Sequence, residues 1–228
     1  MQDFELLRII RVLQFKFSKQ KQNLKMKAIK LFSIACCVAA VCLTSCIGDD
    51  SSEVKNLTQG EIATCLNAVR GTHLGKVYYS APTQKDVNNV DSVDISWTIS
   101  TDSTMTIHDF PARLLAHNID SVSTQGKELR AALQACPDQD IDCYIGFMKI
   151  SPIYWLINPK APKYTVKLND GEHKVQVAFY STNTYSSGIY NTSTKEFSME
   201  IIEGAIYMDD KLTSYLSKDT PFVFYRNK

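Results

Sequence analysis

This sequence has little net charge, few histidines and no hydrophobic run long enough to span a membrane. Its 25 Lys and Arg residues almost balance its 24 Asp and Glu residues, so the charge gives no support to nucleic-acid binding. Its four histidines form no His-Glu-x-x-His pair, and the chain has no Gly-x-Ser-x-Gly elbow and no phosphate-binding glycine loop. We therefore predict a protein that is not an enzyme, with no catalytic residue, no metal site and no cofactor.

The longest apolar segment lies near the start of the chain, from Leu31 to Leu43. A membrane-spanning helix needs roughly 20 residues, so this segment is short for one. Met26, Lys27 and Lys30 precede it as a basic region, and the whole is typical of a secretory signal peptide. The segment ends in Leu-Thr-Ser-Cys, which resembles a bacterial lipobox and predicts a lipid on the thiol of Cys46.

These features divide the chain into four parts. Residues 1–25 are basic and read either as an amphipathic membrane helix or as a segment upstream of the true start at Met26, and we favour the second interpretation. Residues 26–45 are the predicted lipoprotein signal peptide. Residues 46–56 form a polar tether, and residues 57–228 form a single β-rich domain.

Removal of residues 1–45 makes the protein acidic. Eight of the 25 basic residues but only two of the 24 acidic residues lie before Cys46, which leaves a net charge of −5. An acidic domain disfavours nucleic acid and anionic lipid surfaces, so the lipid alone would hold the protein at a membrane. We predict a lipid anchor in the outer membrane, with the domain in the periplasm or on the cell surface. Asp49, Asp50 and Glu53 resemble an acidic surface-export tag or are simply a solvated linker.

The periodicity of the domain predicts short helices and many antiparallel strands. Thr58 and Glu61 form a capping box before one helix, and a second helix is expected over residues 125–136. Apolar residues alternate with polar ones over residues 93–99, and an Asp-Gly turn at 170–171 predicts another hairpin. We predict an α+β fold, mainly antiparallel β, that forms a barrel or a sandwich with two or three short helices.

Two stretches of the domain resemble a known family. The strings ISWTISTDSTMTIHDFP at residues 95–111 and SPIYWLINP at residues 151–159 are similar to an uncharacterised family of Bacteroides lipoproteins, domain of unknown function 4840. The resemblance covers about residues 58–224. It implies a lipocalin-like barrel, but no known activity and no catalytic residue.

Three cysteines, Cys65, Cys136 and Cys143, follow Cys46 in the chain. Export from the cytoplasm makes a disulfide permissible, and three thiols allow one bridge. We favour a Cys136–Cys143 bridge over a short loop, with a Cys65–Cys136 bridge or three buried thiols as alternatives.

Aromatic residues on or beside the predicted strands are the best candidates for ligand contacts. They offer a large apolar surface with a polar group, which suits an apolar ligand or a sugar. The candidates are Tyr78, Trp97, Tyr154, Trp155, Tyr180, Tyr185 and Tyr190, and the alternative is ordinary core packing. We predict a non-enzymatic binding module for a small apolar or carbohydrate ligand, or alternatively a structural or accessory subunit of a surface complex. A closed aromatic cavity would favour the first function, and a filled barrel with an apolar outer face would favour the second.

Overall fold

The computed structural model describes residues 56–81, 85–86, 89–181 and 186–226. The predicted signal peptide, Cys46 and Tyr185 lie outside these residues. The chain divides into two compact units, and the account below concerns residues 56–80 and 90–226 of one of them. Within the described residues, every helix is too short or too polar to cross a membrane.

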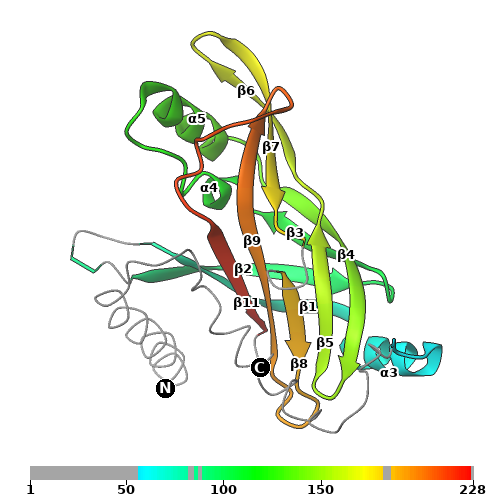
Figure 1. Ribbon diagram of the computed structural model, residues 1–228. Coiled ribbons are helices and arrows are strands. Elements are labelled where there is room, and N and C mark those ends of the chain that lie inside the picture. Colours follow the sequence, from blue (N-terminus) through cyan, green and yellow to red (C-terminus); the bar gives the residue numbers. More distant parts are fainter. Residues whose placement is uncertain (1–55, 82–84, 87–88, 182–185, 227–228) are drawn as a thin grey trace, which may run out of the picture. The chain divides into compact units, whose positions relative to one another are not determined.

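The described strands belong to one antiparallel sheet (Figure 1). They are β1 (Gly71–Ser80), β2 (Val90–Ile99), β3 (Thr104–Phe110), β4 (Gln139–Ile150), β5 (Ile153–Pro159), β6 (Lys163–Leu168), β7 (Gly171–Phe179), β8 (Ser187–Tyr190), β9 (Phe197–Met208), β10 (Lys211–Leu212) and β11 (Thr220–Arg226). The order β11-β1-β2-β3-β4-β5-β8-β9 closes on itself because β9 also pairs with β11. The sheet is therefore an eight-stranded barrel, which confirms the predicted antiparallel β fold and decides for the barrel.

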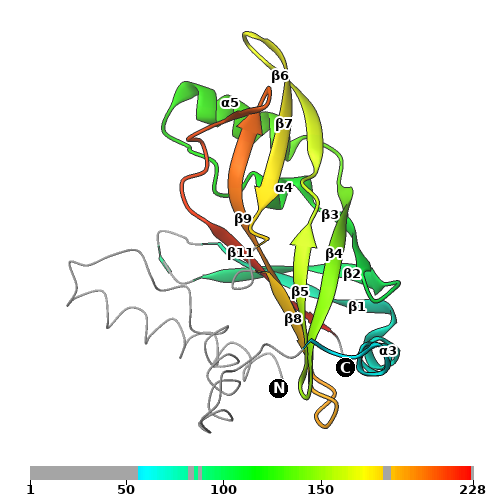
Figure 2. The same cartoon turned by 45° about the vertical axis from the view of Figure 1, so that its right-hand side comes forward.

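Strand β9 belongs to two parts of the fold. Its residues 198–203 pair with β11 inside the barrel, and its residues 203–208 pair with β7 beyond it. The β6–β7 hairpin extends the sheet past the barrel (Figures 1 and 2). Helix α5 (Thr124–Gln134) packs against β6 and covers this extension.

Two of the described helices, α3 (Gln59–Val69) and α5, begin within a residue or two of the predicted positions. Helix α3 has the predicted capping box, in which the Glu61 amide donates to the Thr58 hydroxyl and the Glu61 carboxylate accepts from the Thr58 amide. The single turn α4 (Ala112–Leu115) follows Pro111, and its three buried side chains pack into the core. Helix α5 begins after Ser123, whose hydroxyl accepts from the amide of Gly126.

Aromatic rings fill the interior of the barrel beside β8 and β9. Trp97 and Trp155 are fully buried, and the Phe197 ring lies between them, with centroid distances of 5.4 and 5.2 Å. Gly75 and Gly188 make room for the two indoles, because a Cβ at either position would overlap the facing ring. The large indole rings therefore lie against glycines, which lets the rings of this layer pack closely.

Candidate functional site

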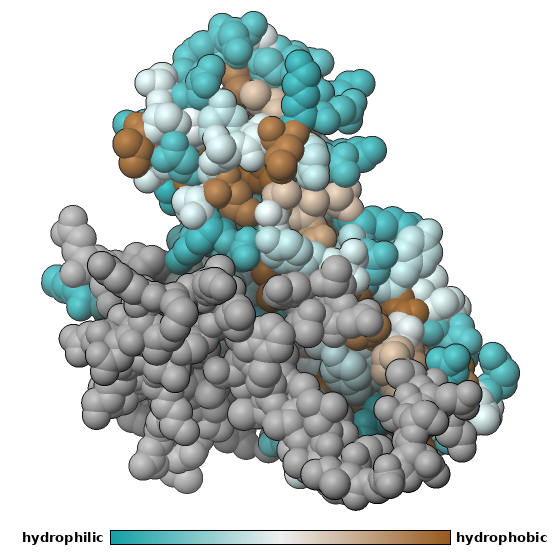
Figure 3. All heavy atoms as spheres, viewed as in Figure 1, coloured by the Kyte–Doolittle hydropathy of each residue, from teal (hydrophilic) through white to brown (hydrophobic). Residues whose placement is uncertain are grey.

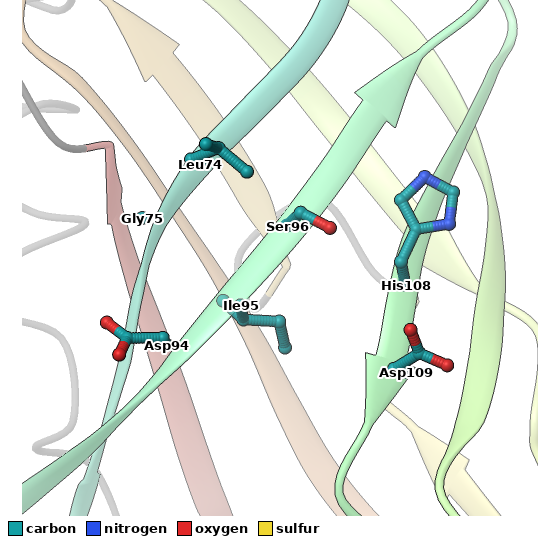
Figure 4. Close-up of a pocket in the computed structure, with 7 residues that line it drawn as sticks. All are labelled: Leu74, Gly75, Asp94, Ile95, Ser96, His108 and Asp109. Carbon is teal, nitrogen blue, oxygen red and sulfur yellow. The ribbon is translucent and has the colours of Figure 1, made fainter.

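An open groove of about 550 Å³ lies on the outer face of strands β1, β2 and β3 (Figure 4). It is lined by Leu74, Gly75, Asp94, Ile95, Ser96, His108 and Asp109. The outward-facing positions among them supply apolar, hydroxyl, imidazole and carboxylate groups to one surface, whereas Gly75 and Ile95 are buried, inward-facing positions.

A β-bulge explains why the neighbours His108 and Asp109 both line this groove. Side chains of a regular strand alternate between faces, but the register of β3 on β4 shifts between Ile107 and Phe110. Asp109 occupies the left-handed region with φ 46°, which aspartate tolerates better than most residues. The bulge therefore aims two consecutive polar side chains at the same side of the sheet.

Asp140, on the neighbouring strand β4, holds the bulge in place. One carboxylate oxygen accepts from the Asp109 amide at 2.9 Å, and the other lies 3.3 Å from Nδ1 of His108. The hydrogen bond from the Asp109 amide, followed by the bond from His108, keeps the pKa of Asp140 below its ordinary value. The carboxylate of Asp140 is thus ionised at neutral pH and fixes the position of the imidazole.

A chain of hydrogen bonds continues from His108 across the sheet. Its Nε2 lies 2.8 Å from the Thr98 hydroxyl, which in turn lies 2.9 Å from the Thr72 hydroxyl. Carboxylate, imidazole and hydroxyl in series are the parts of a nucleophilic triad. A triad also needs N–H donors for the oxyanion, and β2 is paired on both sides at Thr98, so the sheet already uses the nearby amides. The arrangement therefore orients donors and acceptors for binding better than it supports acyl transfer.

Some groups in the groove are committed to internal partners and others are available. Asp94 forms an ion pair of 2.9 Å with Lys76. Among the described residues, the Ser96 hydroxyl and the Asp109 carboxylate have no hydrogen-bond partner, and Leu74 exposes 66% of its surface. A ligand would meet a free hydroxyl, a free carboxylate and an apolar side chain close together.

Comparison with protein families identifies this domain. The profile of the family described as Domain of unknown function (DUF4840) matches residues 68–208. The chain belongs to the DUF4840 family. The match confirms membership of domain of unknown function 4840, which the strings at residues 95–111 and 151–159 suggested; it does not test the Bacteroides origin or the lipoprotein character. Searches of curated proteins and of solved structures find no match.

In this DUF4840 domain, three of the predicted ligand-contacting aromatics are core residues. Trp97 and Trp155 have no exposed surface, and Tyr190 exposes 7%. All three pack on Phe197, with the Tyr190 centroid 6.2 Å away. Trp97, Trp155 and Tyr190 are therefore core residues and not ligand contacts, because their positions on the strands face the interior.

The other described candidates lie on separate parts of the outer surface. Tyr78 meets Tyr225 edge to face at 5.7 Å, and Tyr154 is a half-buried residue on β5. The Tyr180 hydroxyl donates to Asp219 at 3.1 Å. The structure does not bring these tyrosines together, and the groove on β1–β3 contains none of them.

The predicted Cys136–Cys143 bridge is not present in the structure. Cys65, Cys136 and Cys143 all carry free thiols. Cys143 is an inward-facing residue of β4 and its burial raises the pKa of the thiol, whereas Cys136 donates to the Ala132 carbonyl just after α5. The short separation between Cys136 and Cys143 in the sequence suggested a bridged loop. Cys143, however, points from β4 into the core and faces its neighbours in the sheet.

Sequence reasoning missed the groove, although the signal was present. Met105 and Ile107 set an inward phase on β3, yet the next buried apolar residue is Phe110 instead of residue 109. That one-residue shift indicates a bulge and places both His108 and Asp109 on the outer face.

Proposed function

We propose that this protein is a lipoprotein held at the outer membrane by a lipid on Cys46, and that it is a non-enzymatic binding module. The groove on β1–β3 is its ligand site, and the ligand is a carbohydrate. The position of Cys46 directly after a basic and apolar segment supports the anchor.

The arrangement around the bulge is the observation that carries the binding proposal. Sugar hydroxyls both donate and accept hydrogen bonds, so they suit a free carboxylate and a free hydroxyl on one face of the sheet. Asp109 and Ser96 supply these groups, and Asp140 fixes the bulge before any ligand arrives. The proposal of an apolar ligand has less support, because aromatic side chains beside β8 and β9 pack against one another in the core.

A glycan array with the detergent-solubilised full-length protein tests the groove. We expect saturable binding of one glycan class. Asp109→Asn and Ser96→Ala should each weaken this binding about tenfold, because each variant loses one hydrogen bond to the ligand. The bond lost in Asp109→Asn is charge-assisted. Thr165→Ala on the exposed face of β6 is the matched control and should leave binding unchanged. Equal binding by the groove variants and the control would refute the assignment.

The lipid anchor has its own test. Cys46→Ser removes the thiol that the lipid would modify, so the variant should move from the membrane pellet to the soluble fraction after cell breakage. A tight membrane association that survives this change would exclude anchoring through Cys46.

A second function, as an accessory subunit of a surface complex, is favoured by an apolar patch on β4 and β5. Tyr144, Met148 and Ile150 expose between 43% and 55% of their surfaces, and Tyr154 is a neighbouring half-buried residue. Met148→Lys would disrupt such a contact without touching the groove. Crosslinking in intact cells tests this function, with Thr165→Lys as the control. A crosslinked species should be lost in Met148→Lys and kept in Thr165→Lys. Identical crosslinking patterns in the two variants would show that the patch has no such role.

A further inference from the structure

A second open pocket, of about 410 Å³, lies on the β6–β7 hairpin, which extends the sheet past the barrel (Figure 1). Lys163, Lys174, Gln176 and Asp210 are among the residues that line it. Its volume falls within the range of roughly 300–1,000 Å³ that is usual for sites of small ligands. The pocket shares no residue with the groove on β1–β3, so it offers a separate place for a ligand.

The pocket opens on the exposed face of the hairpin. On β6, Lys163 and Thr165 are exposed and Tyr164 between them is buried, and on β7 Lys174 is exposed and Val175 is buried. Alternate residues of a strand point to opposite faces, so the exposed positions of both strands share one surface. The buried positions join the core on the other face, where helix α5 contacts β6.

The pairing of β6 with β7 brings two lysines together on this surface. Lys163 lies opposite Gln176, and Thr165 lies opposite Lys174. Lys163 and Lys174 are therefore diagonal neighbours, at a spacing that long side chains can bridge. Thr165 lies between them, and its short side chain leaves open the space that the two ammonium groups can reach.

These two lysines have no counterion in the part of the chain that the structure describes. Of the described residues, none forms an ion pair with the side chain of Lys163 or Lys174, and none accepts from or donates to the side-chain amide of Gln176. Two like charges that are close together repel each other, so an anion between the ammonium groups would relieve this repulsion.

Protection of a sheet edge explains only part of this arrangement. Strand β6 is the last strand of the sheet, and lysines on an edge strand discourage pairing with other chains. Lys174, however, is on β7, which pairs with both β6 and β9. A lysine on an interior strand beside a pocket fits a role in binding better than a role in edge protection.

Asp210 narrows the chemistry of the ligand. This exposed residue follows β9 in a turn, with φ 62°, and adds one carboxylate to a pocket that is otherwise rich in donors. Ammonium groups only donate hydrogen bonds, and an ionised carboxylate only accepts them. A bare inorganic anion would satisfy the lysines but would be repelled by Asp210. A sugar acid can present its carboxylate to the lysines and its hydroxyl groups to Asp210.

We propose that the pocket on β6 and β7 binds a sugar acid, which is a hydroxylated sugar with one carboxylate. Lys163 and Lys174 hold the carboxylate, the Gln176 amide donates beside them, and Asp210 accepts from the ligand's hydroxyl groups. The net charge of −5 that follows removal of residues 1–45 does not prevent binding, because salt screens charges beyond about 8 Å. This site is separate from the groove on β1–β3 and does not depend on it.

Surface plasmon resonance with the immobilised full-length protein in a non-ionic detergent tests the proposal. The probe is D-galacturonate, and D-galactose is its neutral match, because the two sugars differ only in the carboxylate at C6. We expect saturable binding of galacturonate that is at least tenfold tighter than binding of galactose. Inorganic sulfate at the same ionic strength should bind more weakly than galacturonate, because it has no hydroxyl group for Asp210.

Lysine variants locate the bound carboxylate. Lys163→Met and Lys174→Met each remove one charge and keep most of the side-chain length, so each should weaken galacturonate binding about fivefold, the upper end for an exposed ion pair. Lys174→Arg keeps the charge and should retain binding. Lys167→Met is the matched control, because Lys167 is exposed on the same face of β6 but lies opposite Glu172 and outside the pocket.

Thermal unfolding checks that the variants are folded, and substitutions at these exposed positions should change the melting temperature little. The proposal is overturned if galacturonate shows no saturable binding, or if galactose or sulfate binds as tightly as galacturonate. It is also overturned if Lys167→Met loses as much affinity as Lys163→Met and Lys174→Met.

Discussion

The two halves of β9 take part in different kinds of structure. The first half lies in the barrel, where Phe197 packs between two buried tryptophans. The second half joins the β6–β7 hairpin, whose tip is held by polar contacts and is hydrophilic (Figure 3). There the His173 imidazole bridges Asp209 at 2.7 Å and Asp170 at 3.0 Å. One strand thus connects the aromatic core of the barrel with a hairpin whose tip is held by ionic contacts.

This difference predicts where each half is vulnerable. Apolar packing is independent of pH and sensitive to lost volume. An exposed ionic contact is sensitive to pH and salt and contributes modestly to stability. Substitutions in the two halves should therefore differ in size and in their response to conditions.

The largest effect should follow removal of a buried indole. Trp155→Ala would leave a cavity beside Phe197 and Gly188 and lower the free energy of unfolding by about 3–5 kcal/mol. Urea denaturation measures this loss. Tyr154→Ala, the outward-facing neighbour on β5, is the matched control and should cost much less. Equal costs for both would show that the barrel interior does not dominate stability.

A smaller effect should follow a change in the turn of the β6–β7 hairpin. Gly171 has φ 145°, a conformation that residues with a side chain rarely adopt, so Gly171→Val should cost about 1–3 kcal/mol. Gly146→Ala is the control, because a Cβ there meets nothing within 4 Å and the backbone is ordinary. Thermal unfolding compares the two, and an unchanged melting temperature in Gly171→Val would contradict this turn geometry.

The smallest effect concerns pH at the tip of the hairpin. Hydrogen bonds to Asp209 and then to Asp170 raise the pKa of His173, so the contact is complete below the ordinary value of 6.5 and weakens as pH rises through the raised value. Hydrogen exchange of the amides in residues 171–175 should be faster at pH 8 than at pH 5.5 after correction for the intrinsic rate. Amides of β1 and β2 should show no such difference, and Asp209→Asn should reduce the dependence at the hairpin.

Local features of the fold could be predicted from the sequence. The capping box at Thr58 and the hairpin near Gly171 depend on neighbouring residues. The box lies where the sequence places it, and the hairpin turns at residues 169–170, one residue before the predicted Asp-Gly turn. The alternation around Trp97 also indicated an inward position, since Ile95 and Ile99 share its face. Assigning Trp97 to a ligand site gave more weight to residue type than to this periodicity.

Other features depend on contacts between distant parts of the chain. The barrel closes through pairing of β11 with β1 and β9, and no local pattern specifies these partners. The burial of Glu203 could be read from its place in the apolar alternation of β9, but its lack of a partner depends on β7 and β11. A single carboxylate within a strand is also typical of an exposed edge strand, so residue type alone does not indicate that Glu203 is buried.

The position of β11 has a consequence for synthesis of the protein. Residues 220–226 fill the gap between β1 and β9, so both of those strands keep an unpaired edge until this segment has been made. Unpaired edges recruit other chains, and a nascent barrel of this kind is exposed to aggregation for most of its translation. Chaperones that bind extended strands would protect the growing chain during this interval.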